Sequence, residues 1–334
     1  MTATLPPAPQ TPVDSEGRPA VGAYQGWVER VSWDGLRGTY AHNALYRRLH
    51  AKTWHFVSLG GPRCMAAFAV IDVGYAASAF AYVFDRGARR LLCDLSFTGL
   101  SGAVRVAGTA GPGARSTFKA GGADLLIERP RGGAEWTIRA RGPEGFAIDA
   151  TVDASREPPA LGAVAEIAGG VANCTHKSVC LPVRGHAAAA GTSFDLEGSF
   201  AGFDHTCGLL ARDTRWRWAA ASSATIGFNL VEGFNGPIEN GLWLDGQLIK
   251  VGAAEFRFDA AATMKPWHVR TVDGIIDLDF APEGERREDK NLVIAASRYV
   301  QPVGTFRGTI TAPGRPAVEV RDLLGVTEDH AAKW

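Results

Sequence analysis

Hydrophobic and polar residues alternate over short stretches along most of this chain. The pattern is typical of β-strands, because successive side chains of a strand point to opposite faces. Glycine-rich turns interrupt the alternation about every eight to twelve residues, as in antiparallel sandwiches and barrels. Only one helix is predicted, over Ala41–Lys52, where Leu45 and Leu49 share a stripe. The predicted strands of the first half are Thr53–Leu59, Met65–Val70, Ala77–Phe84, Arg90–Phe97, Leu125–Arg129, Glu135–Ala140 and Phe146–Val152.

The second half continues in the same way. Asp245–Gly246 and Asp273–Gly274 are the pairs that a type I′ hairpin turn favours. They separate Gly241–Leu244 from Gln247–Val251, and Trp267–Val272 from Ile275–Phe280. No alternation of strands with helices appears, which disfavours a doubly wound fold. We therefore predict an all-β protein of two consecutive antiparallel β-barrel or sandwich domains with few short helices.

Proline-rich segments suggest the boundaries. Residues 1–20 are rich in proline and small polar residues and are predicted to form a disordered tail. The segment Arg156–Pro159 interrupts the strand pattern, so we predict an N-terminal domain over 21–160 and a C-terminal domain over 161–334, joined near residues 154–172. The apolar run Met65–Phe84 contains Asp72 and Gly74, which favours a buried hairpin over a membrane helix.

Charge and cysteine content narrow the functional classes. The 334 residues include 35 Lys and Arg against 35 Asp and Glu, and this neutral balance argues against nucleic-acid binding. The N-terminus lacks a basic-then-apolar signal, and the five cysteines are odd in number. We predict reduced cysteines, a cytoplasmic location and no transmembrane segment. The sequence does not indicate an oligomeric state.

The richest stretch for chemistry is Arg215–Gly246. Within it, Glu232 interrupts an otherwise apolar strand face formed by Ile226, Phe228, Leu230 and Phe234. A carboxylate there either pairs with an arginine or faces a cavity, because a buried unpaired charge costs several kcal/mol. A carboxylic acid kept protonated by burial can act as a general acid, so Glu232 is the first catalytic candidate. Predicted substrate-binding residues are Trp216, Trp218, Asn229, Asn235, Glu239, Asn240, Trp243 and Arg298.

Three further acid–base candidates are His176, Asp204 and His205, although the adjacent Asp204 and His205 should point apart on a strand. A zinc site would need His176 and His205 with Cys174 and Cys180, whose spacing matches no familiar pattern, so we predict no metal. Phosphate-loop, HExxH and GxSxG motifs are missing, and no cofactor is predicted. The charged run over residues 285–291 is predicted to be mostly solvated.

Several segments resemble one family, the largely bacterial domain of unknown function 2804, and they occur in the family's order. They are DVGYAASAFAYVFD (72–85), HKSVCLPVRG (176–185), WRWAAASSATIGFNLVEGFN (216–235), ENGLWLDG (239–246), PEGERREDKNLVIAASRYVQPVGTFRG (282–308) and GVTEDHAAKW (325–334). The two-part β plan is also similar to the tandem lipocalin-like proteins that include carotenoid hydratases and tocopherol cyclases. This likeness implies a cavity and cofactor-free acid chemistry on hydrophobic, isoprenoid-like substrates.

Three interpretations follow. The first is a cofactor-independent hydratase, cyclase or isomerase that acts on a hydrophobic alkene, with Glu232 as acid and tryptophans beside the developing cation. The second is a lipocalin-like protein that binds a hydrophobic small molecule without chemistry. In the third, Glu232 and Glu239 pair with Arg298 or Arg217 and hold the domains together.

Overall fold

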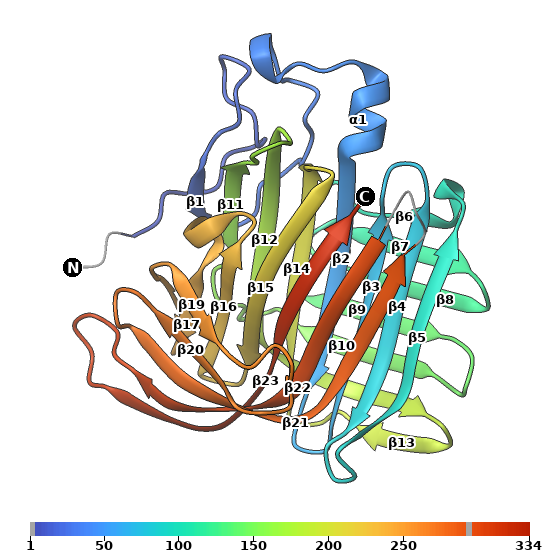
Figure 1. The fold of residues 1–334 in the computed structure, drawn as a ribbon, viewed down its shortest axis with the longest axis vertical. Coiled ribbons are helices and arrows are strands. Elements are labelled where there is room, and N and C mark those ends of the chain that lie inside the picture. Colours follow the sequence, from blue (N-terminus) through green and yellow to red (C-terminus); the bar gives the residue numbers. More distant parts are fainter. Residues whose placement is uncertain (1–3, 292–295) are drawn as a thin grey trace.

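The structure is a computed structural model that describes residues 4–291 and 296–334. The chain forms two antiparallel sheets with very little helix, which confirms the all-β prediction (Figure 1). The beginning of the predicted tail (1–3) and most of the apolar stretch before Arg298 (292–295) lie outside the described residues.

The first sheet contains fourteen strands. Its main path runs β5-β4-β3-β2-β14-β12-β10-β9-β8-β7-β6, with β1 and β11 joined along β12 and β13 paired to β12. The strands are β1 (Gly22–Gln25), β2 (Ala51–Gly60), β3 (Cys64–Asp72), β4 (Ala77–Asp85), β5 (Arg90–Gly99), β6 (Val104–Arg105), β7 (Arg115–Ala120), β8 (Ala123–Glu128), β9 (Glu135–Arg141), β10 (Ala147–Asp153), β11 (Leu161–Glu166), β12 (Ala172–Ala189), β13 (Thr192–Asp195) and β14 (Ser199–Leu209).

The first sheet curls around its own hydrophobic core. Every second residue of β8 (Ala123, Leu125 and Ile127) is buried, as its alternating sequence predicts. Side chains from both ends of the sheet, such as Phe97 of β5 and Phe118 of β7, meet in this core and lie 6.2 Å apart between ring centroids. One face of the sheet is therefore turned inward, and the other face of β2, β3, β4, β12 and β14 is left to pack elsewhere.

The second sheet contains nine strands in the order β18-β17-β16-β15-β23-β22-β21-β20-β19. Its core includes Phe228, Leu230, Trp267 and Phe306. The strands are β15 (Asp213–Ser222), β16 (Ile226–Gly233), β17 (Gly241–Leu244), β18 (Gln247–Lys250), β19 (Ala254–Arg257), β20 (Trp267–Thr271), β21 (Ile276–Asn291), β22 (Ala296–Ile310) and β23 (Val318–Lys333).

The two Asp-Gly turns behave differently. Asp245 and Gly246 both have positive φ (49° and 75°), as a type I′ turn between β17 and β18 requires. In the second pair only Gly274 has a positive φ, 72°, so the connection between β20 and β21 is a turn of another type. The glycine is needed in both turns.

The two sheets pack against each other through the outer face of the first. Phe56, Tyr82 and Phe84 of β2 and β4 contact Val303 of β22 and Val326 of β23. Figure 1 shows β21–β23 lying beside β2–β5. Ion pairs add to this contact. Arg86, in the turn after β4, pairs with Glu283 of β21 at 2.7 Å, and Asp94 of β5 pairs with Arg286 of β21 at 2.8 Å.

The strands change sheet between Leu209 and Asp213, not near the predicted boundary at 160. The segment Arg156–Pro159 instead connects β10 to β11, and both of these strands pair with the same long strand β12. The proline-rich break is thus a connection inside the first sheet. Proline disrupts a strand locally but does not show which sheet the next strand will join.

The N-terminal segment is a second correction. From residue 4 onward it is ordered: Ala8 donates a backbone hydrogen bond to Gln25 of β1, and Gln25 donates one to Pro6. Leu5 and Val13 pack against two hydrophobic clusters that contain residues of β11 and β12. These scattered apolar side chains outweigh the polar composition on which the disorder prediction rested.

The predicted helix is shorter than expected. Helix α1 covers Ala44–His50 and is capped by the Asn43 side chain, which accepts a hydrogen bond from the backbone N–H of Tyr46. Short 3-10 turns lie at η1 (Gly38–Tyr40), η2 (Ser101–Ala103) and η3 (Gly236–Glu239). Leu45 and Leu49, the predicted apolar stripe, are 67% and 49% exposed. Their spacing was correct for a helix but did not mark a buried face.

Close approach of the sheets makes Gly227 of β16 a sensitive position. A Cβ atom there would lie 2.5 Å from Val179 Cγ2 and 2.8 Å from Cys180 Sγ. We expect Gly227→Ala to lower the free energy of unfolding by about 1–3 kcal/mol, because the extra methyl overpacks the contact between the sheets. Urea titration measures this. Gly102→Ala, which meets nothing within 4 Å, is the control, and equal stability of the two variants would contradict the inter-sheet contact.

Candidate functional site

A cavity of about 120 Å³ lies between the two sheets. The outer face of the first sheet forms one wall, through β2, β3, β4, β12 and β14, and β15, β16 and β21–β23 form the other. Its apolar surface is largely aromatic, with Trp54, Phe56, Phe80, Trp216, Trp218, Phe234 and Trp334.

Strand alternation decides which residues reach this cavity. On β14, Asp204 and Thr206 line it, whereas Phe203 belongs to the core of the first sheet and His205 points the same way as Phe203. The prediction that Asp204 and His205 point apart is confirmed. On β12, Lys177 lines the cavity and lies directly opposite Asp204 across the strand pair.

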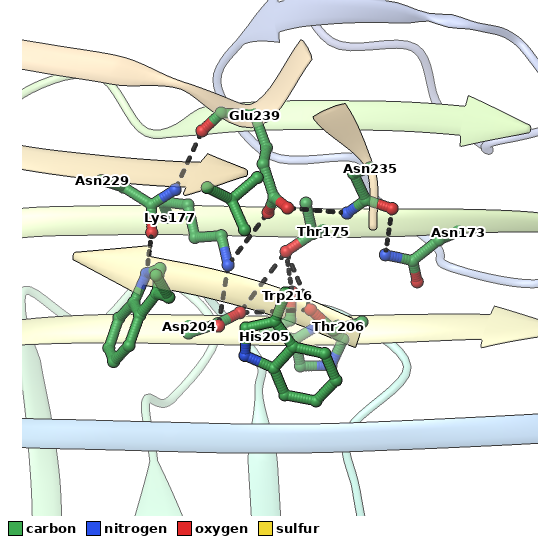
Figure 2. Close-up of polar contacts among 12 residues, drawn as sticks. Asn173, Thr175, Lys177, Asp204, His205, Thr206, Trp216, Asn229, Asn235 and Glu239 are labelled. Atoms are coloured by element: carbon green, nitrogen blue, oxygen red, sulfur yellow. Dashed lines mark hydrogen bonds and ion pairs between the residues drawn. The ribbon is translucent and has the colours of Figure 1, made fainter. Parts of the chain in front are cut away.

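A buried lysine bridges two carboxylates at one end of the cavity. Lys177 Nζ lies 2.7 Å from Asp204 Oδ2 and 3.1 Å from Glu239 Oε2, as Figure 2 shows. The three side chains are 6%, 15% and 3% exposed, so Asp204 is the most accessible of them. With all three groups ionised, the cluster carries one net negative charge inside a mainly aromatic cavity.

Amide side chains orient Glu239. Asn235 Nδ2 donates to Glu239 Oε1 (3.0 Å), and Asn173 donates in turn to Asn235. Asn229 Nδ2 donates to the Glu239 backbone carbonyl (2.9 Å), while its Oδ1 accepts from Trp218 Nε1. These bonds are drawn in Figure 2. They fix the carboxylate and one tryptophan ring of the cavity in a single network.

The backbone brings Glu239 to Lys177 by a tight reversal after β16. Gly233, Phe234 and Gly236 have φ values of 81°, 44° and 66°, and the 3-10 turn η3 follows. A positive φ is uncommon for a phenylalanine and is found where surrounding contacts enforce it. Phe234 lines the cavity and packs against Trp54 and Trp216 with ring centroids 6.3 and 5.7 Å away.

Burial and charge act in opposite directions on this cluster. Burial raises the pKa of Glu239, and the neighbouring Lys177 ammonium opposes only part of that rise. Burial alone would lower the pKa of Lys177, but the two carboxylates outweigh it and its pKa is raised. Lys177 therefore stays charged, and Glu239 takes up a proton more readily than an ordinary glutamate.

A second polar group lies on the opposite wall. Glu328 of β23 accepts hydrogen bonds from Trp216 Nε1 (2.7 Å) and Gln301 Nε2 (2.6 Å). His330, two residues further along the strand, has Nδ1 3.5 Å from Glu328 Oε1 and its ring 4.2 Å from that of Trp216 between centroids. The cavity thus has titratable groups on both walls.

Glu232, the first catalytic candidate from the sequence, does not line the cavity. It lies opposite Arg217 on β15 and pairs with it at 2.6 Å, with a side chain 36% exposed. Phe228 and Leu230 on the same strand face point into the second core, and Glu232 lies where this face emerges at the strand end. The alternation was predicted correctly, but the opposite face of β16, with Asn229 and Val231, turns to the site.

His176 and His205 are also on the far side of their strands. His176 Nε2 accepts a hydrogen bond from the Val28 backbone N–H, and His205 Nε2 donates to the Ala107 carbonyl. Burial lowers the pKa of both imidazoles, so they are neutral. Both are core histidines that do not line the cavity, so neither is placed to act as an acid or base there.

Three residues predicted to bind substrate do not line the cavity. Trp243 packs with Leu161 and Val179 and donates to the Pro159 carbonyl. Asn240 accepts from the Val231 backbone N–H (2.7 Å) and donates to the Gly252 carbonyl (3.0 Å). Arg298 is exposed on β22, where side chains alternate with the cavity-lining Tyr299. By contrast, Asp204, Trp216, Trp218 and Glu239 line the cavity, and Asn229 and Asn235 hold Glu239.

We expect Asn240→Ala to lower the free energy of unfolding by about 1–3 kcal/mol, because the buried Val231 N–H loses its acceptor. Chemical denaturation measures the loss. Ligand binding in the cavity should change little in the variant, since Asn240 does not line it. Unaltered stability together with lost binding would show that Asn240 belongs to the site after all.

Sequence reasoning missed Lys177, Glu328 and His330. A usable signal existed for the last two, because Val326, Glu328 and His330 alternate on one strand face as Glu232 does on its own. Lys177 had no such signal, since its partners Asp204 and Glu239 lie far from it in the sequence.

Metal centres and membrane helices are two other features that bear on function. Over residues 4–291 and 296–334, no group of three or more His, Cys, Asp or Glu side chains is arranged to hold a metal ion. Within the same ranges, no helix has the length and apolar character needed to cross a bilayer. The apolar run Met65–Phe84 forms the hairpin of β3 and β4, as predicted.

A sequence profile described as Domain of unknown function (DUF2804) matches residues 7–334. The chain belongs to the DUF2804 family. No curated protein sequence matches it.

Solved structures share the architecture of this DUF2804 protein. CghA superposes with a TM-score of 0.55 at 11% sequence identity, over 100% of this chain and 97% of that one, and it has also been crystallised with Sch210972. Kievitone hydratase from Nectria haematococca gives a TM-score of 0.55 at 9% identity, over 100% and 98% of the two chains. The likeness confirms the two-part, lipocalin-like β architecture over the whole chain.

Proposed function

We propose that the protein is a cofactor-independent acid–base enzyme of the hydratase, cyclase or isomerase type. Its substrate is a hydrophobic, alkene-containing and isoprenoid-like molecule, bound in the cavity between the two sheets. The observation that carries the proposal is the buried Lys177–Asp204–Glu239 cluster in an aromatic cavity. Charged groups held in a low-dielectric concave site with shifted pKa values are typical of catalytic sites.

In this proposal Asp204 is the group that exchanges a proton with the substrate, because it is the more exposed carboxylate of the cluster. Two carboxylates share one ammonium, so the cluster readily takes up one proton. Glu239, whose pKa is raised, stores this proton, and Lys177 passes it on by donating to one carboxylate while accepting from the other. The protonated Asp204 then donates it to an alkene carbon.

The steps after protonation use residues on the opposite wall of the cavity. Protonation of the alkene leaves a carbocation, which the faces of Trp216 and Trp218 and the negative cluster stabilise. Addition of water to the cation and loss of one proton complete a hydration, and loss of a neighbouring proton completes an isomerisation. Glu328 and His330 are positioned to accept that proton. Kievitone hydratase, a protein of this fold, is by its name a hydratase, which supports the proposal by analogy only.

The alternative is a binding protein that uses the same cavity without chemistry. Full pairing of Lys177 with two carboxylates favours it, because such a network can be purely structural. Catalysis in labelled water distinguishes the two functions.

The test is a screen of isoprenoid alkenes, and of an apolar extract of the cells that make the protein, in buffer prepared with D₂O. Mass spectrometry should find a product heavier by one water, or an isomer that carries deuterium on carbon, with the wild-type protein only. Recovery of a tightly bound compound that never gains deuterium or water would support the binding protein instead.

A further inference from the structure

Arg286 of β21 is buried in the contact between the two sheets, where its residue is only 1% exposed. The sequence placed it in a solvated charge run, and the structure corrects that prediction. It lies opposite Gln301 in the β21–β22 pair, and both residues line the cavity. A fully desolvated arginine needs partners for its charge and for its five N–H groups.

Most of these groups are satisfied. Nε and Nη2 donate to Asp94 Oδ1 at 2.9 and 2.8 Å, and Nη2 also donates to the Tyr299 hydroxyl at 2.7 Å. The guanidinium carbon lies 4.4 Å from the ring centroid of Phe80 and 4.6 Å from that of Tyr82. These contacts fix the plane of the guanidinium.

One nitrogen of the Arg286 guanidinium, Nη1, remains without a partner in the described part of the chain. Nη1 is buried and has no hydrogen-bond partner among the residues that the structure describes, although it carries two N–H groups. The Tyr299 hydroxyl accepts from Arg286 and so keeps its own hydrogen to donate. Unpaired donors of this kind cost several kcal/mol in a buried site unless a ligand or water completes them, so they mark a place where an acceptor binds.

Nearby acidic groups limit what the acceptor can be. Asp94 neutralises the single positive charge of Arg286 and is the more exposed partner, so a ligand is held at Nη1 mainly by hydrogen bonds. Both oxygens of Glu328 already accept N–H groups from Trp216 and Gln301, which leaves the donors at Arg286 and Tyr299 for the ligand. The free N–H groups of Nη1 and the neighbouring Tyr299 hydroxyl can donate to the two oxygens of one planar carboxylate, whereas a single hydroxyl offers only one oxygen.

We infer that Arg286 and Tyr299 bind an anionic oxygen group of the substrate, such as a carboxylate. The substrate class is then an apolar alkene acid, whose charged end lies at Arg286 and whose chain crosses the tryptophans toward Asp204. This inference rests on the proposed function, since it names the substrate of the same cavity. It also gives that substrate an orientation, because one end of the cavity recognises oxygen and the other exchanges the proton.

The test compares geranic acid with geraniol, which share a carbon skeleton and differ in the terminal group. Calorimetric titration of the intact protein near neutral pH should give about tenfold or greater preference for the acid. Tyr299→Phe keeps the ring and removes one donor, and Arg286→Lys keeps the charge and removes the fork. Each should reduce the preference severalfold, while Arg298→Lys, on the exposed side of β22, should not change it.

Equal affinity of the wild-type protein for the two compounds, or no binding of either, would overturn the inference. So would a preference that survives in Tyr299→Phe, the variant least expected to disturb folding. Acid preference without any turnover would leave the binding site intact and contradict the proposed catalysis. Turnover of neutral alkenes without acid preference would support the proposed catalysis and contradict the acid-binding site.

Discussion

Replacing Lys177 with methionine is expected to lower the free energy of unfolding by about 3–5 kcal/mol at neutral pH, the usual cost of leaving a buried charge unpaired. Lys177 is the ammonium that contacts both Asp204 and Glu239, and its side chain is 6% exposed. Methionine fills a similar volume, so little of the loss will come from packing. Two carboxylates then face each other in the cavity without a cation.

The loss should depend on pH in a defined direction. In the folded protein the pKa of Glu239 is already raised by burial, so protonation of this group favours the folded state. Its contribution to stability is fully present below the unfolded pKa, about 4.3, and is lost as the pH rises through the folded value. Removing Lys177 raises the folded pKa further. The variant should therefore approach wild-type stability in acid and fall behind it toward neutral pH.

Guanidinium titrations between acidic and neutral pH measure this difference. Lys119→Met is the matched control, because Lys119 pairs with Asp124 at 3.1 Å with both side chains well exposed. Exposed pairs contribute little, so the control should show nearly unchanged stability at every pH. A Lys177→Met protein as stable as the control would mean that the carboxylates are not held together as a buried anionic pair.

The second large effect is expected from Asp204→Asn. The change keeps the size and the contact with Thr206, and Lys177 retains Glu239 as a partner, so the protein should fold. The amide cannot exchange a proton with the substrate. Turnover of the compound found in the D₂O screen should fall about 100-fold or more, the usual scale for a general acid or base.

Glu232→Gln is the informative control for this variant. It removes a carboxylate that the sequence marked as catalytic but that pairs with Arg217 outside the cavity. Its turnover should stay close to that of the wild type. The opposite result, with Glu232→Gln inactive and Asp204→Asn active, would return the catalytic role to the residue predicted from the sequence.

Glu232 and Asp204 illustrate what strand alternation can and cannot predict about the site. Strand alternation predicted about half of the strands within a few residues, and it correctly separated Asp204 from His205, but it gave no bounds for β12, β14, β22 or β23. It could not say which face of a strand turns to its own core and which turns to the other sheet. The β16 face with Ile226, Phe228 and Leu230 is apolar, so Glu232 stood out on it as the acid. The opposite face has Asn229 and Val231 between two glycines, and Asn229 was predicted only as a binding residue.

Lys177 and Arg286 show a second limit. Lys177 has its partners on β14 (Asp204) and in the turn η3 (Glu239), and Arg286 has its partners on β5 (Asp94) and β22 (Tyr299), so each set comes from both sheets or from distant parts of the chain. Pairing between strands is not encoded in local periodicity. The reversal that carries Glu239 back to Lys177 depends on a positive φ at Phe234, a conformation that phenylalanine rarely adopts and a sequence does not announce.

The location of the site between the two sheets is tested most directly by a crystal structure of the protein with geranic acid bound. The acid oxygens should contact Arg286 and Tyr299, and the chain should lie across Trp216 and Trp218 with an alkene carbon next to Asp204. Electron density for the ligand inside the core of either sheet, or anywhere that leaves the cavity between the sheets empty, would contradict this location.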